Sequence, residues 1–400
     1  MTSWSALLIP LLFTQVIAQG IFDKYIDEEN KKNDGETTGK EENKDQATPK
    51  SSEYYCRVGG KWQDCFPVPC GSCLLRNQHF SVMILFKPKE EQILILIDGS
   101  PTQKEQKEFP IGSEDDPVRA TFSWYKSEDK CKEAEKEPKQ KKAENGPLYA
   151  IYNDAMPYSP GVSTGGSSKG VIVYRNSSGF FMTHTVPGFP DVDEYKWTEE
   201  MYSSAHLFIC LTLDKKMAED IMSQLSYAGP LIYAASVPKD ERKREPGKTL
   251  YKLLTTDKQR PSSGGRSFNA KAGKQNFFFF MKVGRPETDL TGDLIAKHFA
   301  QSFAVFTGVE IMKGDKKLPS KCRGGFKVEN VRDTISVAKY DHTPYQNDFS
   351  WSCSSQTFCL LSQGRTVKDQ RKHGMATCVA SKKARKSFCS SVTNKTLERC

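Results

Sequence analysis

Long hydrophobic runs are scarce in this sequence of 400 residues. The apolar stretch within residues 1–18 has a core of about ten residues, whereas a membrane-spanning helix needs roughly twenty. It closes on Val16-Ile17-Ala18, an ending typical of a secretory signal that a peptidase removes. The later run 277–281 is stopped by Lys282. We therefore predict a signal peptide at residues 1–18, no membrane anchor, and a secreted, extracellular protein that is soluble.

The motifs of common metal and nucleotide sites are also missing. The six histidines show no H-x-x-x-H or H-E-x-x-H spacing, and no glycine-rich P-loop is present. The segment 70–73 has the C-x-x-C spacing of redox and zinc sites, but no second C-x-x-C follows it. The sequence therefore predicts neither a metal nor a cofactor. A metal-free phosphoryl-transfer site would need an imidazole as nucleophile or acid and a cation to hold the phosphate.

Cysteine, by contrast, is abundant. Twelve cysteines in an exported chain are most simply disulfides, because the oxidising compartment favours them. Their pairing does not follow from the sequence. The triplets that begin at Asn176 and Asn394 are N-glycosylation acceptors, so we predict glycans at both positions.

Charge is unevenly spread along the chain. The net charge is +9, yet residues 19–53 are rich in acidic side chains and almost free of apolar ones. Such a segment cannot bury enough surface to offset the entropy of ordering, so we predict an acidic, disordered linker. The positive charge belongs to residues 54–400, where it would attract a polyanion. An ordinary solvated basic surface is the alternative.

Strand-like and helix-like patterns are mixed from residue 54 onward. Apolar runs at 80–86, 93–97 and 206–213 are typical of strands, whereas 217–227 and 293–306 show helical periodicity. This mixture predicts an α/β fold with mixed sheets flanked by helices. The length allows one large domain or two intimate ones.

Short motifs along the chain are more specific. Residues 167–171 read SSKGV, residues 184–187 read HTVP, and residues 341–345 read DHTPY. They resemble the G-H-x-K-G-V, H-S-x-P and D-H-S-K-W segments of the deoxyribonuclease II family. Residues 148–154 and 370–378 resemble its L-Y-N-D strand and its Q-R-G-G-G-T-x-C segment. The resemblance extends over most of the chain beyond the acidic segment.

This resemblance implies a phospholipase D-like architecture with a pseudo-twofold pair of lobes, approximately residues 54–230 and 231–400. Each lobe would contribute an H-x-K motif to one phosphate site in the cleft between them. One histidine would attack phosphorus, the other would protonate the leaving oxygen, and the lysines would neutralise the oxyanions without a metal. Family members with an intact site cut double-stranded DNA at acidic pH.

The sequence departs from the family pattern in both motifs. Ser167 stands where the first motif has histidine, and Lys169 is retained. In the second motif His342 is retained, and Pro344 stands where the family has lysine. His184 matches a third family histidine. Losing a nucleophile or a general acid costs several orders of magnitude in rate.

We therefore predict a secreted deoxyribonuclease II-like glycoprotein of the pseudoenzyme type, similar to the divergent members that parasitic nematodes export. It would bind DNA, a peptide or a host protein, with lost or much reduced hydrolysis. An active, metal-independent acid endonuclease with His342 as nucleophile is one alternative, and a structural or antigenic protein is another. The segment 361–365 keeps only Arg365 of the family's G-D-x-N-R. No oligomeric state follows from the sequence.

Overall fold

The computed structural model describes the folded part of the chain with several gaps. It describes residues 55–58, 61–64, 73–75, 78–99, 106–122, 147–157, 166–175, 178–191, 194–255, 261, 263–398 and 400, with only the backbone course up to residue 80. The predicted signal peptide, the acidic linker, the C-x-x-C cysteines as side chains and the acceptor Asn176 lie outside this description.

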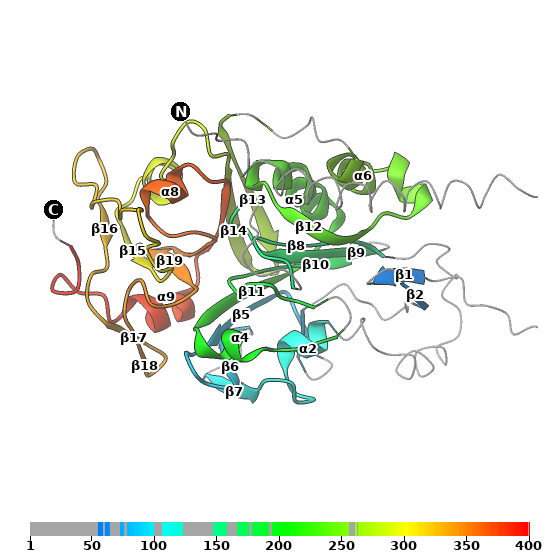
Figure 1. Cartoon of the computed structure of the whole chain (residues 1–400), viewed down its shortest axis with the longest axis horizontal. Helices are drawn as coiled ribbons and strands as arrows, with labels where there is room; N and C mark the ends of the chain where they lie inside the picture. The colour runs from blue at the N-terminus through cyan, green and yellow to red at the C-terminus, as the bar shows by residue number, and fades with distance from the viewer. Residues whose placement is uncertain are drawn as a thin grey trace, which may run out of the picture. The chain divides into compact units, whose positions relative to one another are not determined.

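The first sheet has eight strands, each antiparallel to its neighbours, in the spatial order β12-β8-β9-β10-β11-β5-β6-β7 (Figure 1). They are β5 (Val82–Lys87), β6 (Ile93–Asp98), β7 (Lys107–Pro110), β8 (Leu148–Asn153), β9 (Gly170–Arg175), β10 (Ser178–His184), β11 (His206–Leu213) and β12 (Leu231–Ser236). The central strands are apolar at nearly every position because both faces of the sheet are covered.

The second sheet has seven strands in the order β13-β14-β21-β20-β19-β15-β16, with only β15 and β16 parallel. They are β13 (Gly265–Ala272), β14 (Gln275–Lys282), β15 (Phe303–Thr307), β16 (Val328–Asn330), β19 (Ser350–Cys353), β20 (Phe358–Leu361) and β21 (Gly374–Val379). Three separate strand pairs are β1 (Tyr55–Val58) with β2 (Lys61–Asp64), β3 (Cys73–Leu75) with β4 (Gln78–Phe80), and β17 (Ile335–Val337) with β18 (Tyr340–His342).

The described helices are short apart from α5. They are α2 (Pro117–Thr121), α4 (Glu199–Ser203), α5 (Lys215–Ala228), α6 (Gly247–Thr255), α7 (Ala296–Phe299), α8 (Val367–Gln370), α9 (Lys382–Cys389), the 3-10 turn η2 (Lys239–Lys243) and the π-helical turn η4 (Leu290–Ile295). The prediction of a helix over residues 293–306 is wrong beyond Phe299. Ala300 adopts a left-handed φ of 51° that ends α7, and β15 begins at Phe303.

The main hydrophobic core lies between the two sheets. Phe181 of β10 contacts Phe279 of β14 with ring centroids 6.0 Å apart, and Phe86 of β5 lies 5.7 Å from Phe349. A second cluster covers the other face of the first sheet, and a third covers the other face of the second sheet. Each sheet is therefore buried on both faces, and the shared layer joins them.

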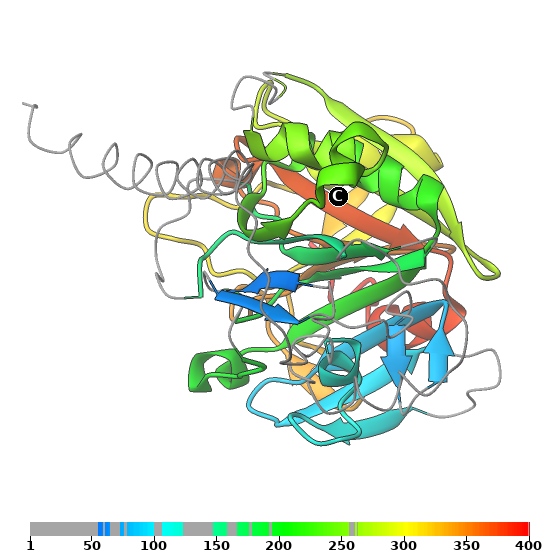
Figure 2. The same cartoon turned by 90° about the vertical axis from the view of Figure 1, so that its right-hand side faces the viewer.

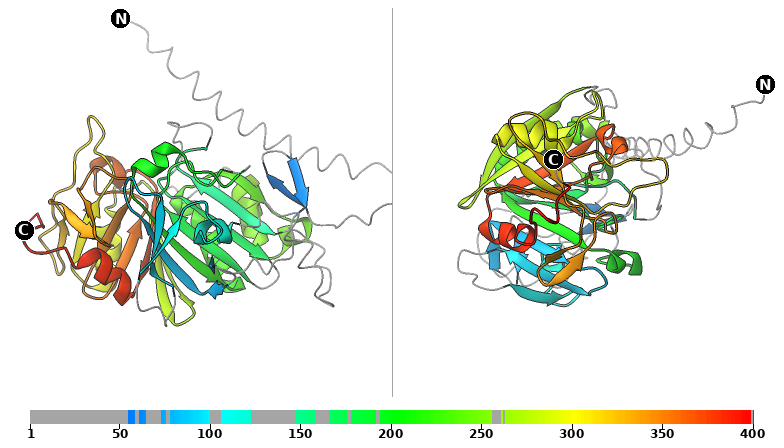
Figure 3. Two further views of the ribbon diagram at one scale, coloured as in Figure 1. Left: turned by 90° about the horizontal axis from the view of Figure 1, so that it is seen from below. Right: turned by 90° about the vertical axis from the view of Figure 1, so that its left-hand side faces the viewer.

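Two helices connect the sheets. Helix α5 follows β11, begins at the side-chain cap of Asp214, and contacts β13 and β14 of the second sheet. It lies beside α6 in Figure 2. Helix α9 follows β21, begins at the cap of Ser381, and contacts β6 of the first sheet, as the red helix beside the blue strands in Figure 3. Each sheet thus supplies a helix that packs against the other.

The α/β architecture and the disulfide bonding are confirmed. Cys322–Cys400, Cys353–Cys389 and Cys359–Cys378 are bonded. The boundary at residue 230 between the lobes stays a prediction, and β12, which begins directly after it, pairs with β8 of the first sheet. None of the helices that the structure describes has the length and apolarity needed to span a membrane.

Candidate functional site

A cavity of about 270 Å³, with five charged side chains in its lining, lies at the ends of strands from both sheets. On the first sheet the lining residues follow β8, precede β9 and follow β10; on the second they follow β15, precede β19 and follow β20. They are Asp154, Ala155, Ser167, Lys169, Thr185, Pro187, Val309, Asp348, Leu361, Ser362, Gln363, Gly364, Asp369 and Lys372. The predicted site residues Ser167 and Lys169 are among them.

Ser167 and Lys169 occupy the short segment that leads into β9. The Ser167 amide donates to the carbonyl oxygen of His373 at 3.0 Å, which fixes the segment against the second sheet. Lys169 is only 7% exposed, and its ammonium forms an ion pair with the carboxylate of Asp154. The retained motif lysine is therefore held in the cavity wall, with its charge compensated by a neighbour.

His184, the last residue of β10, lies behind this wall. Its ring packs against Phe189 and Phe208, with centroids 5.6 and 5.7 Å away. Burial, and secondarily the charge of Lys169, lowers the pKa of His184 to about 3. His184 is thus a neutral aromatic core residue and is not among the residues that line the cavity.

His342 is not brought to the cavity. It ends β18, and its ring lies edge-on to Phe86 and Phe349 at 5.3 Å from each. Burial lowers the pKa of His342 to about 4. Neither His342 nor Pro344 lines the cavity. The structure thus unites one predicted half-motif, Ser167 with Lys169, and places the other elsewhere.

Three carboxylates line the cavity, and only Asp154 belongs to a motif seen in the sequence. Asp348, half-buried two residues before the start of β19, makes no hydrogen bond or ion pair with the residues described. Asp369 lies in α8, where burial raises its pKa and the Lys372 ammonium is 3.9 Å away. No local sequence pattern marks Asp348 as a lining residue.

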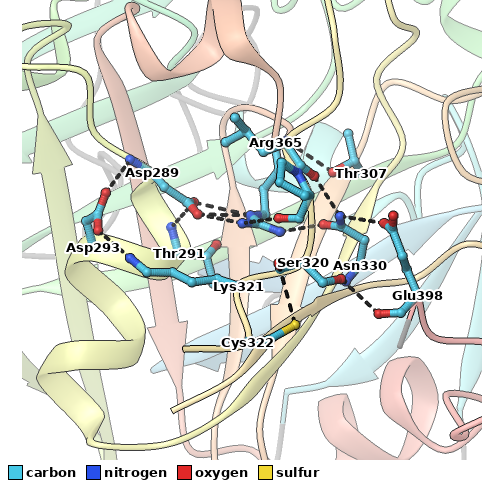
Figure 4. A network of polar contacts seen from close by, with 12 residues as sticks. Asp289, Thr291, Asp293, Thr307, Ser320, Lys321, Cys322, Asn330, Arg365 and Glu398 are labelled. Atoms are coloured by element: carbon cyan, nitrogen blue, oxygen red, sulfur yellow. Dashed lines mark hydrogen bonds and ion pairs between the residues drawn. The ribbon is translucent and has the colours of Figure 1, made fainter. Parts of the chain in front are cut away.

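Arg365, the residue retained from the family's G-D-x-N-R, has a supporting position (Figure 4). Its guanidinium contacts the carboxylate of Asp289 at 2.7 Å and the side-chain oxygen of Asn330 at 2.5 Å, and its amide donates to Thr307 at 3.1 Å. Asn330 in turn donates to Glu398 near the C-terminus at 3.0 Å. Arg365 therefore holds the loop that carries the lining residues 362–364.

The lining groups define what the cavity can do chemically. Two ammonium groups, of Lys169 and Lys372, belong to the lining, each beside a carboxylate, but no histidine is among the described lining residues. Within the described ranges, no group of three or more His, Cys, Asp or Glu side chains is suited to a metal ion. The cavity as described lacks the imidazole that metal-free phosphoryl transfer requires.

The paired sheets, with the cavity at their strand ends, form an α/β protein, and a family match assigns it to the phospholipase D-like class. The family model of deoxyribonuclease II matches residues 107–400, and the chain belongs to the deoxyribonuclease II family. It is 25% identical to plancitoxin-1 of Acanthaster planci, over 61% of this chain and 69% of the relative. It is 28% identical to cell death-related nuclease 6 of Caenorhabditis elegans, over 50% of this chain and 52% of that protein. It is also 28% identical to deoxyribonuclease-2-beta of Rattus norvegicus, over 54% and 60% respectively. The chain thus spans roughly half to two thirds of these relatives.

Proposed function

We propose that this protein is a secreted, deoxyribonuclease II-like binding glycoprotein that has lost most or all hydrolysis of DNA. The observation that carries the proposal is the cavity, which has Ser167 and Lys169 on one wall and no described histidine on any. Serine does not titrate near neutral pH, so it cannot replace an imidazole as general acid or base. Phosphate can still be positioned by ammonium groups without being cleaved efficiently.

DNA is the ligand that the surroundings of the cavity favour. Exposed basic side chains lie on segment 313–317, on helix α8 and directly after it, where Lys372 lines the cavity, and we call them the basic rim: Lys313, Lys316, Lys317, Lys368, Arg371 and Lys372. The two segments touch, because the amide of Val367 donates to the carbonyl oxygen of Lys316 at 2.8 Å. Exposed ammonium and guanidinium groups beside a cavity attract a phosphate backbone.

Plasmid nicking tests the loss of hydrolysis. The purified protein, incubated with chelator at acidic and neutral pH, is expected to leave supercoiled plasmid intact while it retards a DNA duplex in a gel. His342→Ala and Lys169→Ala are included as matched variants. If the wild-type protein nicks DNA and either substitution stops it, the protein is an acid endonuclease with an altered site. If it neither nicks nor binds DNA, a peptide or host-protein ligand replaces DNA in the proposal.

Secretion and glycosylation are tested separately. Asn394 is exposed on the C-terminal segment, where a glycan has room. Expression in eukaryotic cells is expected to release protein whose N-terminus follows residue 18 and whose mass falls on enzymatic removal of N-glycans. The shift should be smaller in Asn394→Gln. Retention of the full-length chain inside the cell would contradict secretion.

A further inference from the structure

The two sheets repeat one arrangement of strands around the cavity. Strands β8, β9, β10, β11 and β5 are neighbours in this order in the first sheet. Strands β15, β19, β20, β21 and β14 are neighbours in the same order in the second sheet, and every one of these pairs is antiparallel. The helices α5 and α9 follow the equivalent strands β11 and β21. The lobes are therefore related strand by strand.

Two buried lysines fix the residue equivalence. Lys87 ends β5 and pairs with His206, the first residue of β11; Lys282 ends β14 and pairs with Gly374, the first residue of β21. The Lys87 ammonium donates to carbonyl oxygens of the turn before β11, including that of Ser204 at 2.7 Å. The Lys282 ammonium donates to three carbonyl oxygens of the turn before β21, at 2.5 to 3.2 Å. His206 and Gly374 are therefore equivalent.

The pairing of neighbouring strands extends this equivalence to the residues near the cavity. Two residues further along, Phe208 faces His184 and Ala376 faces Leu361, so His184 is equivalent to Leu361. One residue earlier on these strands, Thr183 faces Gly170 and Leu360 faces Trp351. Gly170 is therefore equivalent to Trp351.

The residues that precede Gly170 and Trp351 by one to three positions include the half-motif of Ser167 and Lys169 and its equivalent. Ser167 is equivalent to Asp348, and Lys169 is equivalent to Ser350. His342 lies six residues before Asp348, in the separate strand pair of β17 and β18. It has no position in the repeated arrangement.

The lining of the cavity independently agrees with this register. The same count pairs three further sets of residues, and every member lines the cavity: Ala155 with Val309, Thr185 with Ser362, and Pro187 with Gly364. Asp154, the ion-pair partner of Lys169, is equivalent to Gly308. The Gly308 amide donates to the Ser350 hydroxyl oxygen at 3.2 Å, so the contact persists where both charges are absent.

We infer that the second half of the cavity site is Asp348 with Ser350, and that His342 and Pro344 have no part in it. The inference rests on the proposed function, since it names the groups that replace both halves of a phosphate-cleaving site. Trp351 then matches the tryptophan of the family's D-H-S-K-W, which Tyr345 does not. Of two imidazoles and two ammonium groups, only Lys169 remains, and a carboxylate that repels phosphate stands at the position of the second imidazole.

Two sets of reverting substitutions test this assignment by plasmid nicking with chelator at acidic pH. The first set is Ser167→His with Asp348→His and Ser350→Lys; the second is Ser167→His with Pro344→Lys, which completes the motif around His342. The first set is expected to nick DNA at least about a hundredfold faster than the wild-type protein, because general acid–base groups contribute that much. The second set is expected to remain at the wild-type level. Nicking by the second set, or by neither although both are folded, overturns the inference.

Inorganic phosphate gives a readout that does not depend on a folded triple variant. Asp348→Asn removes one negative charge from the cavity, whereas Asp341→Asn removes one from the exposed position of β18, next to His342. Calorimetry is expected to show phosphate bound about tenfold more tightly by Asp348→Asn than by the wild-type protein, and unchanged in Asp341→Asn. Equal affinities in all three overturn the inference. Efficient nicking by the wild-type protein would instead refute the proposed function, whichever aspartate matters for phosphate.

Discussion

Most of the buried residues that hold the strand ends around the cavity are alike in the two lobes, whereas the residues that line the cavity are not. We call the former the supports of the cavity. Lys87 and Lys282 hold the turns before equivalent strands, and Cys210 and Cys378, both disulfide-bonded, occupy equivalent positions in β11 and β21. The lining differs at the position that would carry chemistry, where Ser167 is equivalent to Asp348. Groups that pair with buried carbonyl oxygens are needed for folding, whether or not the cavity carries out a reaction. The residues that line the cavity are needed only for that reaction.

One supporting residue is an exception: Arg365, whose equivalent in the first lobe is Gly188. Arg365→Met is expected to lower the free energy of unfolding by about 3–5 kcal/mol, because Asp289 would be left buried and unpaired. Urea unfolding measures the loss. The control is Arg332→Met, an exposed residue paired with exposed Asp333, which should cost less than about 1 kcal/mol. Equal small losses would show that the loop at 362–364 does not depend on Arg365.

The buried lysines should matter in both lobes. Burial lowers the pKa of Lys87 and of Lys282 to about 8, so both stay mostly charged at neutral pH. Methionine at either position would leave carbonyl oxygens unpaired, and we expect a loss of about 2–3 kcal/mol in urea unfolding. Lys282→Met should cost more than Lys87→Met, because Lys282 binds three carbonyls and Lys87 binds two. The reverse order would mean that the two turns are not equivalent supports.

Each lobe also buries a histidine that makes stability depend on pH. The pKa of His184 is about 3 and that of His342 about 4, both below the ordinary value near 6.5. The unfolded chain therefore takes up protons first, and stability is lost as pH falls from about 6.5 toward 4. At pH 5 each histidine should cost about 2 kcal/mol relative to pH 7.5.

Urea unfolding of His342→Phe at the two pH values isolates one of these contributions. The substitution keeps an aromatic ring between Phe86 and Phe349, so packing changes little. Its stability should fall less between pH 7.5 and 5 than that of the wild-type protein. An unchanged pH dependence would show that His342 is not the group that titrates on unfolding.

The sequence predicts the scaffold better than the site. Apolar runs such as 206–213 become strands because burial on both faces requires apolar residues throughout, and that requirement is visible locally. The half-motif at Ser167 and Lys169 is found because the residues around it still resemble the family's G-H-x-K-G-V segment. The other half could not be found: Asp348 and Ser350 carry none of the family's residue types, and the retained string at 341–342 resembles the motif but lies in another strand pair. Only the register across several ladders, which no local pattern contains, identifies Asp348.

The last expected effect concerns the salt dependence of DNA binding, which should differ between exposed lysines of the two lobes. Lys313, Lys316 and Lys368 of the basic rim form no ion pair with the described residues, whereas Lys196, Lys215 and Lys216 of the first lobe are paired with neighbouring carboxylates. If the three rim lysines contact DNA phosphates, their replacement by glutamine should reduce the slope of log affinity against log salt by about 3, since each contact contributes about 0.9. Replacing the three first-lobe lysines keeps the same net charge change and should leave the slope unchanged. Equal changes in both sets would mean that DNA responds to the total charge of the protein and not to a surface beside the cavity.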